Sequence, residues 1–125
     1  MQLFHRPLSV RLLGLAMLVG TAAGFAFHNE LTRSSPAKES TVASPVEIRL
    51  WFREKSEPAL SSITLVRTSD SSKVALAKVA RTDDPLSIKA AVPATLAPGG
   101  YLVSWRTAGE DGHVIRGSFP FTIGK

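Results

Sequence analysis

The chain has 125 residues, with 15 lysines and arginines, 10 aspartates and glutamates, and no cysteine. This length suits a single domain. Because acidic and basic residues are interspersed, the net charge of +5 does not indicate a nucleic-acid-binding surface. Without cysteine there are no disulfides and no thiolate metal sites, so a bound metal must use nitrogen and oxygen ligands.

The first 27 residues have the pattern of a secretory signal peptide. Arg6 and Arg11 give a basic start, an apolar run follows, and small residues mark a cleavage zone. The run is short for a membrane span, which needs about 20 residues, although an uncleaved anchor is an alternative. We expect residues 1–27 to form a signal helix that is removed and residues 28–125 to form the mature domain. Removal of the signal peptide lowers the net charge from +5 to +3, because this segment holds two basic residues and no acid.

The rest of the chain shows strand patterns separated by turns. Residues 28–46, rich in serine, proline and charge, predict a short opening strand or extended arm followed by a loop. Further strands are predicted over residues 61–67 and 73–79. Two other segments alternate with the period of a half-buried strand. Their apolar faces are Val46, Ile48, Leu50 and Phe52 in residues 46–53, and Leu86, Ile88, Ala90 and Val92 in residues 86–92.

The last two strand patterns flank a loop near the C-terminus. They place Tyr101, Val103 and Trp105 on one face, and Phe119, Phe121 and Ile123 on another. We therefore expect Trp105 in the core, whereas Trp51 falls on the polar face of its strand and should be partly exposed. Pro120 cannot donate a ladder hydrogen bond, which predicts a sheet edge or a bulge.

Together these patterns predict an all-β fold. About seven short strands, broken by proline, glycine and serine turns, are typical of an antiparallel Greek-key β-sandwich of the Ig-like or cupredoxin-like kind. No helical periodicity is found outside the signal helix that precedes the sandwich.

Asp111 and His113 carry the clearest chemical signal. Side chains two apart on an extended chain point to the same side, so this carboxylate and imidazole form half of a candidate metal site. The pattern also fits an ordinary surface aspartate that hydrogen-bonds a histidine. His28, at the predicted cleavage zone, adds an imidazole and, at a new N-terminus, an amine whose proton a metal displaces near neutral pH. Three nitrogens and one oxygen suit Cu(II), while Zn(II) accepts the same side chains.

A hydrolytic function is not indicated. No arrangement of serine, histidine and acid stands out, and no pair of carboxylates has an obvious apolar pocket. We therefore expect no catalytic residues, and we expect Glu110 to be a solvated neighbour of Asp111.

Several motifs, in order along the chain, resemble the CopC copper-resistance family of periplasmic copper-binding proteins. The motifs are H-x-x-L-x-x-S-x-P at 28–36, P-x-x-I-x-L-x-F-x-E at 45–54, G-x-Y-x-V-x-W-R at 99–106, D-G-H at 111–113 and G-x-x-x-F-x-I at 117–123. Each motif is weak by itself, and the set covers essentially all of the mature region.

The resemblance implies a β-sandwich that binds Cu(II) in the periplasm through His28, Asp111 and His113. Glu54 matches an acid near the site in the family. The implied function is that of a non-enzymatic, monomeric copper carrier or buffer in copper resistance. Its implied partners are the copper ion and an inner-membrane copper transport protein, with no nucleic acid.

Three departures from the family pattern keep alternatives open. The methionine-rich Cu(I) loop of some members is missing, and Gly109 replaces a serine common two residues before the aspartate. A cut after Ala26 would leave Phe27 ahead of His28, so the terminal amine would belong to Phe27. A metal-free Ig-like interaction module of the cell envelope and, less favoured, an oxidative copper enzyme are the alternatives.

Overall fold

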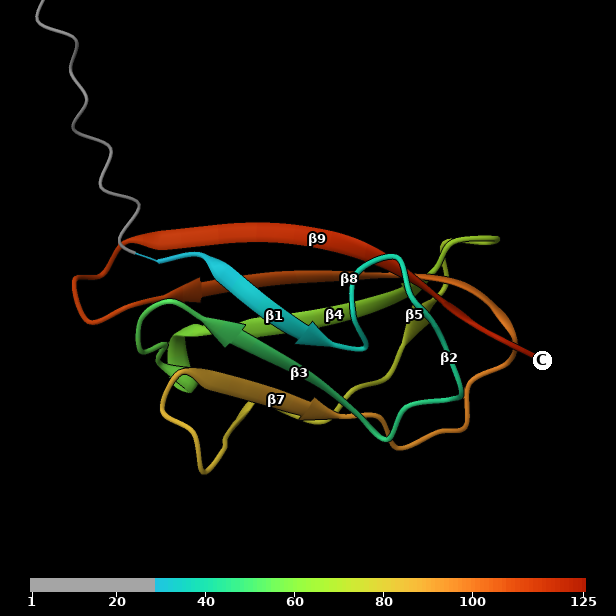
Figure 1. The fold of residues 1–125 in the computed structure, drawn as a ribbon, viewed down its shortest axis with the longest axis horizontal. Helices are drawn as coiled ribbons and strands as arrows, with labels where there is room; N and C mark the ends of the chain where they lie inside the picture. Colours follow the sequence, from blue (N-terminus) through green and yellow to red (C-terminus); the bar gives the residue numbers. More distant parts are fainter. Residues whose placement is uncertain (1–28) are drawn as a thin grey trace, which may run out of the picture.

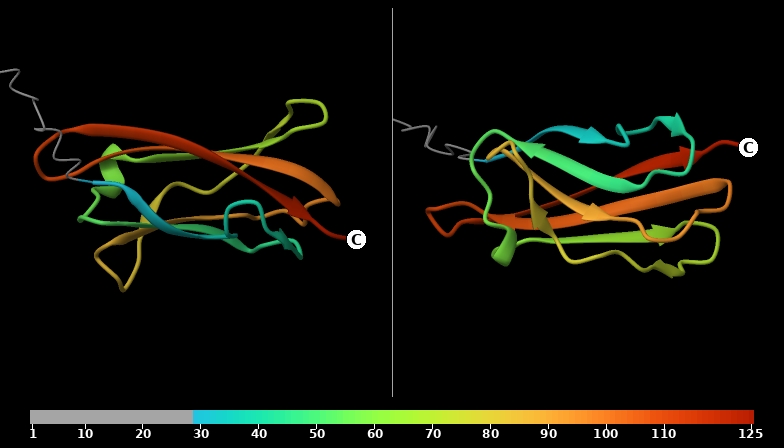
Figure 2. Two further views of the ribbon diagram at one scale, coloured as in Figure 1. Left: turned by 45° about the horizontal axis from the view of Figure 1, so that its top comes forward. Right: turned by 90° about the horizontal axis from the view of Figure 1, so that it is seen from below.

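The computed structural model describes residues 29–125, and the predicted signal peptide, its helix and His28 lie outside this range. The described residues form two sheets packed against each other (Figures 1 and 2). One sheet has the order β1 (Leu31–Ser35), β3 (Glu47–Phe52), β7 (Ser87–Ala91), β6 (Ala80–Arg81). The other has the order β2 (Thr41–Val42), β9 (Val114–Ile123), β8 (Gly99–Ala108), β4 (Ser62–Arg67), β5 (Lys73–Val74). The predicted all-β sandwich is confirmed.

The strands number nine within the described residues, against about seven expected, because β2, β5 and β6 have only two residues each. The chain passes repeatedly from one sheet to the other, as Greek-key sandwiches do. Most neighbouring strands are antiparallel, whereas β2 pairs with β9 in parallel. The one helical element in residues 29–125 is the short 3-10 turn η1 (Pro58–Leu60), and no helix there is long and apolar enough to cross a membrane.

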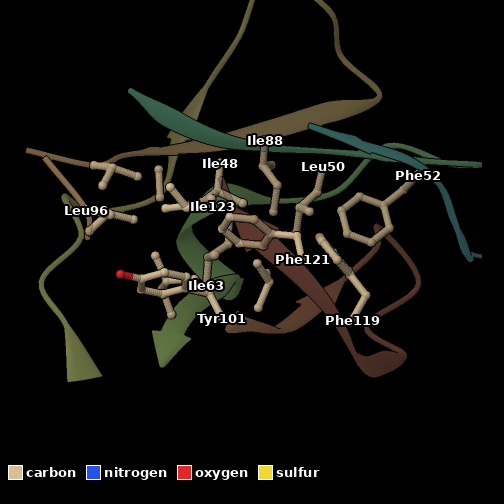
Figure 3. Packing of buried hydrophobic residues seen from close by; sticks show 14 residues of the cluster. Ile48, Leu50, Phe52, Ile63, Ile88, Leu96, Tyr101, Phe119, Phe121 and Ile123 are labelled. Atoms are coloured by element: carbon tan, nitrogen blue, oxygen red, sulfur yellow. The ribbon is translucent and has the colours of Figure 1, made fainter. Parts of the chain in front are cut away.

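The core lies between the two sheets and is built from the alternating faces predicted above (Figure 3). Its members include Ile48, Leu50, Phe52, Ile88, Tyr101, Val103, Phe119, Phe121 and Ile123. Tyr101 stacks on Phe121 with ring centroids 5.7 Å apart. Its hydroxyl donates to the carbonyl oxygen of Ala97 at 2.7 Å, so the buried oxygen is satisfied.

Some predicted strand patterns run beyond the strands. Val46 is 80% exposed and Leu86 is also exposed, because each directly precedes its strand. Only Lys73–Val74 of the predicted strand over residues 73–79 joins a sheet. Val46 and Leu86 therefore do not belong to the core, whereas Val92, just after β7, does.

Trp105, expected in the core, packs against the core cluster but is only half-buried, so the expectation is met in part. Its ring meets Phe52 edge-on, with centroids 5.2 Å apart. On the facing strand it lies over Gly117, where a Cβ atom would come within 2.5 Å of the indole. Glycine at this position leaves the room that the ring occupies.

Trp51 is half-buried, as predicted. The guanidinium groups of Arg33 and Arg49 lie 3.9 and 4.7 Å from its ring centroids and shield it from water. Pro120 is not on an edge strand, since β2 continues the sheet beyond β9, but among the described strands β2 pairs only with Thr122–Ile123 and not with Pro120. Its carbonyl oxygen accepts from the backbone N–H of Glu39 at 2.7 Å and so points away from β8. The nitrogen that lacks a hydrogen faces the same way, and no hydrogen bond to β8 is lost.

One end of the sandwich gathers segments that are far apart in the sequence (Figure 1). The start of β1, the end of β3, η1, the start of β7 and the loop between β8 and β9 all lie there. This end carries Asp111 and His113.

Candidate metal centre

The loop between β8 and β9, residues 109–113, is called the metal loop below. The backbone N–H of Gly112 donates to the carbonyl oxygen of Gly109 at 3.0 Å, which closes a tight turn. Gly112 has a φ of +77°, a left-handed conformation that glycine adopts at little cost. The turn joins two ten-residue strands and is therefore held by a long ladder of backbone hydrogen bonds.

Asp111 and His113 contact each other, as their spacing predicts. Oδ1 of Asp111 accepts from the backbone N–H of His113 at 3.0 Å, and Oδ2 lies 2.8 Å from Nδ1 of its ring. The side chains are 39% and 75% exposed. A carboxylate on one ring nitrogen orients an imidazole and, with the proton on Nδ1, leaves the lone pair on Nε2. This is a common arrangement for a histidine that binds a metal.

The pair lines an open pocket of about 570 Å³, shared with Glu54, Lys55 and Glu110. Glu54 is thus beside the candidate site. Three carboxylates against one ammonium make the pocket acidic, which favours a cation.

Glu110 is solvent-exposed, as expected from the sequence, and it also takes part in an ion pair. Its Oε1 lies 3.7 Å from Nζ of Lys55 and so joins the metal loop to the segment after β3. Exposed ion pairs of this kind contribute little stability. The pair therefore shows that the two segments lie beside each other, but it does little to hold them there.

The first described residues are hydrogen-bonded to the segment after β3, part of which lines the same pocket. Oδ1 of Asn29 accepts from the backbone N–H of Glu54 at 2.9 Å, and its Nδ2 donates to Oγ of Ser56 at 3.2 Å. The carbonyl oxygen of Glu30 accepts from the backbone N–H of Arg53 at 2.9 Å. No sequence pattern marks Asn29 or Lys55, because a contact between distant segments leaves no local signal.

Gly109 does not prevent the metal loop from forming. A Cβ atom there would lie 3.5 Å from Oδ1 of Asp111 and 3.6 Å from the carbonyl oxygen of Lys55, which are ordinary contacts. The position therefore has room for the serine that the family pattern carries. The loop holds its shape without it through the hydrogen bonds between Asp111 and His113.

Asp111 and His113 fit a metal chemically but do not complete a coordination set. Within residues 29–125, no three side chains of histidine, cysteine, aspartate or glutamate gather closely enough to hold a metal ion. The pair offers one imidazole and one carboxylate, a donor mixture that Cu(II) and Zn(II) both accept. His28, the third predicted ligand, lies outside the described residues.

Fold and pocket together define a small β-sandwich protein with a candidate metal site at one end. Residues 31–124 match the model of the CopC domain, and the chain belongs to this family of copper resistance proteins.

Three known proteins illustrate the relationship. Copper resistance protein C of Xanthomonas campestris pv. juglandis is 33% identical over 124 residues, which cover 94% of this chain and 96% of that protein. Copper resistance protein C of Escherichia coli is 34% identical over 113 residues, covering 86% and 90%. The crystal structure of PcoC, a methionine-rich copper resistance protein from Escherichia coli, superposes with a TM-score of 0.70 at 36% identity and covers 77% of this chain and 98% of that one.

Proposed function

We propose that this protein is a periplasmic, non-enzymatic carrier or buffer of copper that binds one Cu(II) ion through His28, Asp111 and His113. The observation that carries the proposal is the oriented Asp111–His113 pair in an open acidic pocket. Membership of the CopC family and the copper resistance named for its relatives support copper as the cargo.

The donor types favour Cu(II) over Cu(I). Cu(I) prefers soft sulfur ligands, but the chain has no cysteine, and both of its methionines, Met1 and Met17, fall in the predicted signal peptide. Imidazole nitrogen and carboxylate oxygen suit Cu(II), which also binds most tightly in the divalent series. In this assignment Asp111 supplies a carboxylate oxygen and His113 a ring nitrogen to the metal.

His28 is proposed as the third ligand because it directly precedes Asn29, which is hydrogen-bonded to the segment that lines the pocket. Removal of residues 1–27 would add the amine of His28 to the donors. A cut one residue earlier would give the amine to Phe27 and would draw on the intervening amide nitrogen. The proposal includes export by this signal peptide, a monomeric mature domain, and delivery of copper to an inner-membrane copper transport protein.

A titration of the exported protein with Cu(II), followed by electron paramagnetic resonance, tests the proposal. We expect one equivalent to give a tetragonal spectrum with nitrogen couplings, and mass spectrometry of the same sample defines the first residue. Asp111→Ala should weaken binding.

Asp70→Ala is the matched control, because Asp70 also accepts the backbone N–H two residues later at 3.0 Å, in a different loop. It should bind as the unmodified protein does. A spectrum of aqueous copper at one equivalent and neutral pH would exclude the proposal and favour the metal-free interaction module.

A further inference from the structure

We infer that Asn29 is a positioning residue for copper: its side-chain amide holds the backbone next to His28 against the segment that lines the metal pocket. The inference rests on the proposed function, and it adds a residue that contributes without touching the metal.

The Asn29 side chain has a single well-defined set of partners. The residue is 8% exposed, and a buried amide is costly unless its hydrogen bonds are made. Its oxygen accepts from the backbone N–H of Glu54 at 2.9 Å, and its nitrogen donates to the hydroxyl of Ser56 at 3.2 Å. Both ends of the amide are therefore engaged by residues 54–56, called the anchor segment below.

The anchor segment is itself joined to the metal loop. Lys55, between the two partners of Asn29, lines the pocket and pairs with Glu110 at 3.7 Å. Just beyond the segment, the backbone N–H of Glu57 donates to the carbonyl oxygen of Ala108 at 3.1 Å, at the end of β8. Asn29 is thus tied through one short segment to the loop that carries Asp111 and His113.

Fixing Asn29 limits where the preceding residue can go. Consecutive Cα atoms are about 3.8 Å apart, so fixing Asn29 restricts the positions open to the residue before it. A ligand held near its bound position loses less conformational entropy when the metal binds. Removing groups that orient metal ligands typically weakens metal binding about 10–100-fold, and we expect this range for Asn29→Ala.

The experiment compares Cu(II) binding by the exported protein, Asn29→Ala and Ser44→Ala, at a temperature well below the melting point of all three. Ser44 is the matched control: its hydroxyl oxygen accepts from the backbone N–H of Leu96 at 2.8 Å, and the pair lies at the opposite end of the sandwich. Affinity is measured by competition with a chelator, and the coordination by electron paramagnetic resonance.

We expect Asn29→Ala to lose affinity about 10–100-fold and to change the spectrum, while Ser44→Ala changes neither. Ser56→Ala removes only the partner of the amide nitrogen and should show a smaller loss in the same direction, which keeps the test available if Asn29→Ala folds poorly. Unchanged affinity and spectrum in the Asn29 and Ser56 variants would overturn the inference, as would an equal loss in Ser44→Ala. If the unmodified protein binds no Cu(II), the proposed function itself fails.

Discussion

Replacing His113 by alanine separates metal binding from folding. The imidazole is 75% exposed, so its removal opens no core cavity. Exposed substitutions usually change the free energy of unfolding by no more than about 0.5 kcal/mol. For a domain of this size that corresponds to a change in melting temperature of about 2–4 °C.

The effect of copper should be much larger. A ligand present at 100 times its Kd stabilises the folded state by about 2.7 kcal/mol, which raises the melting temperature by roughly 10–20 °C. If loss of the His113 imidazole raises Kd a hundredfold, the same copper concentration stabilises His113→Ala by only about 0.4 kcal/mol. The copper-induced shift should therefore nearly vanish while the metal-free protein melts almost normally.

Melting curves of the unmodified protein and His113→Ala, each with and without Cu(II), measure both effects. Ser72→Ala is the matched control, because Ser72 also stands two residues after an aspartate that accepts its backbone N–H. Its copper-induced shift should equal that of the unmodified protein. An undiminished shift in His113→Ala would refute its role as a ligand, and a large loss of stability without metal would instead indicate a structural histidine.

Three further outcomes test the fold and the loop. Gly117→Ala should destabilise by about 1–3 kcal/mol, measured by denaturant unfolding, because its Cβ would come within 2.5 Å of the Trp105 ring; unchanged stability would contradict this packing. In Gly109→Ser the added Cβ atom meets only ordinary contacts, so the variant should retain copper binding. Its free energy of unfolding should rise by about 0.4–1 kcal/mol, because serine restricts the unfolded chain. Weaker copper binding or lower stability would show that the loop needs glycine. The side-chain hydrogen bond from Ser72, with its backbone N–H, lowers the pKa of Asp70, so its small stabilising effect should be present at neutral pH and fade as pH falls through the lowered pKa. Ser72→Ala should raise that pKa part of the way to its ordinary value, as an NMR titration would show.

Local sequence patterns were enough to predict the strands that form the core. Alternation of side chains depends only on the extended backbone, and it correctly placed residues such as Leu50 and Phe121 inside the sandwich. The same reasoning found that Asp111 and His113 lie side by side, because a separation of two residues leaves them within reach. It failed at Val46 and Leu86, since alternation does not reveal where a strand stops pairing.

The contacts around the candidate site were beyond such reasoning. The family resemblance predicted that Glu54 lies near the site. The ion pair between Lys55 and Glu110 and the hydrogen bonds of Asn29 were visible only in the three-dimensional structure. Each joins segments separated by many residues. Whether such segments lie close together depends on the order of strands in the two sheets, and the alternation of residues along one strand carries no information about that order.

The sequence by itself therefore determined the class of fold, the faces of the main strands and the acid–imidazole pair, because each is set by spacings of two residues along an extended chain. Tertiary structure alone decided what surrounds that pair. The order β1-β3-β7-β6 brings the start of β1 beside the end of β3, and packing of the two sheets lays that end against the loop after β8. Only this long-range pairing places the residue that follows His28 on the segment that lines the Asp111–His113 pocket.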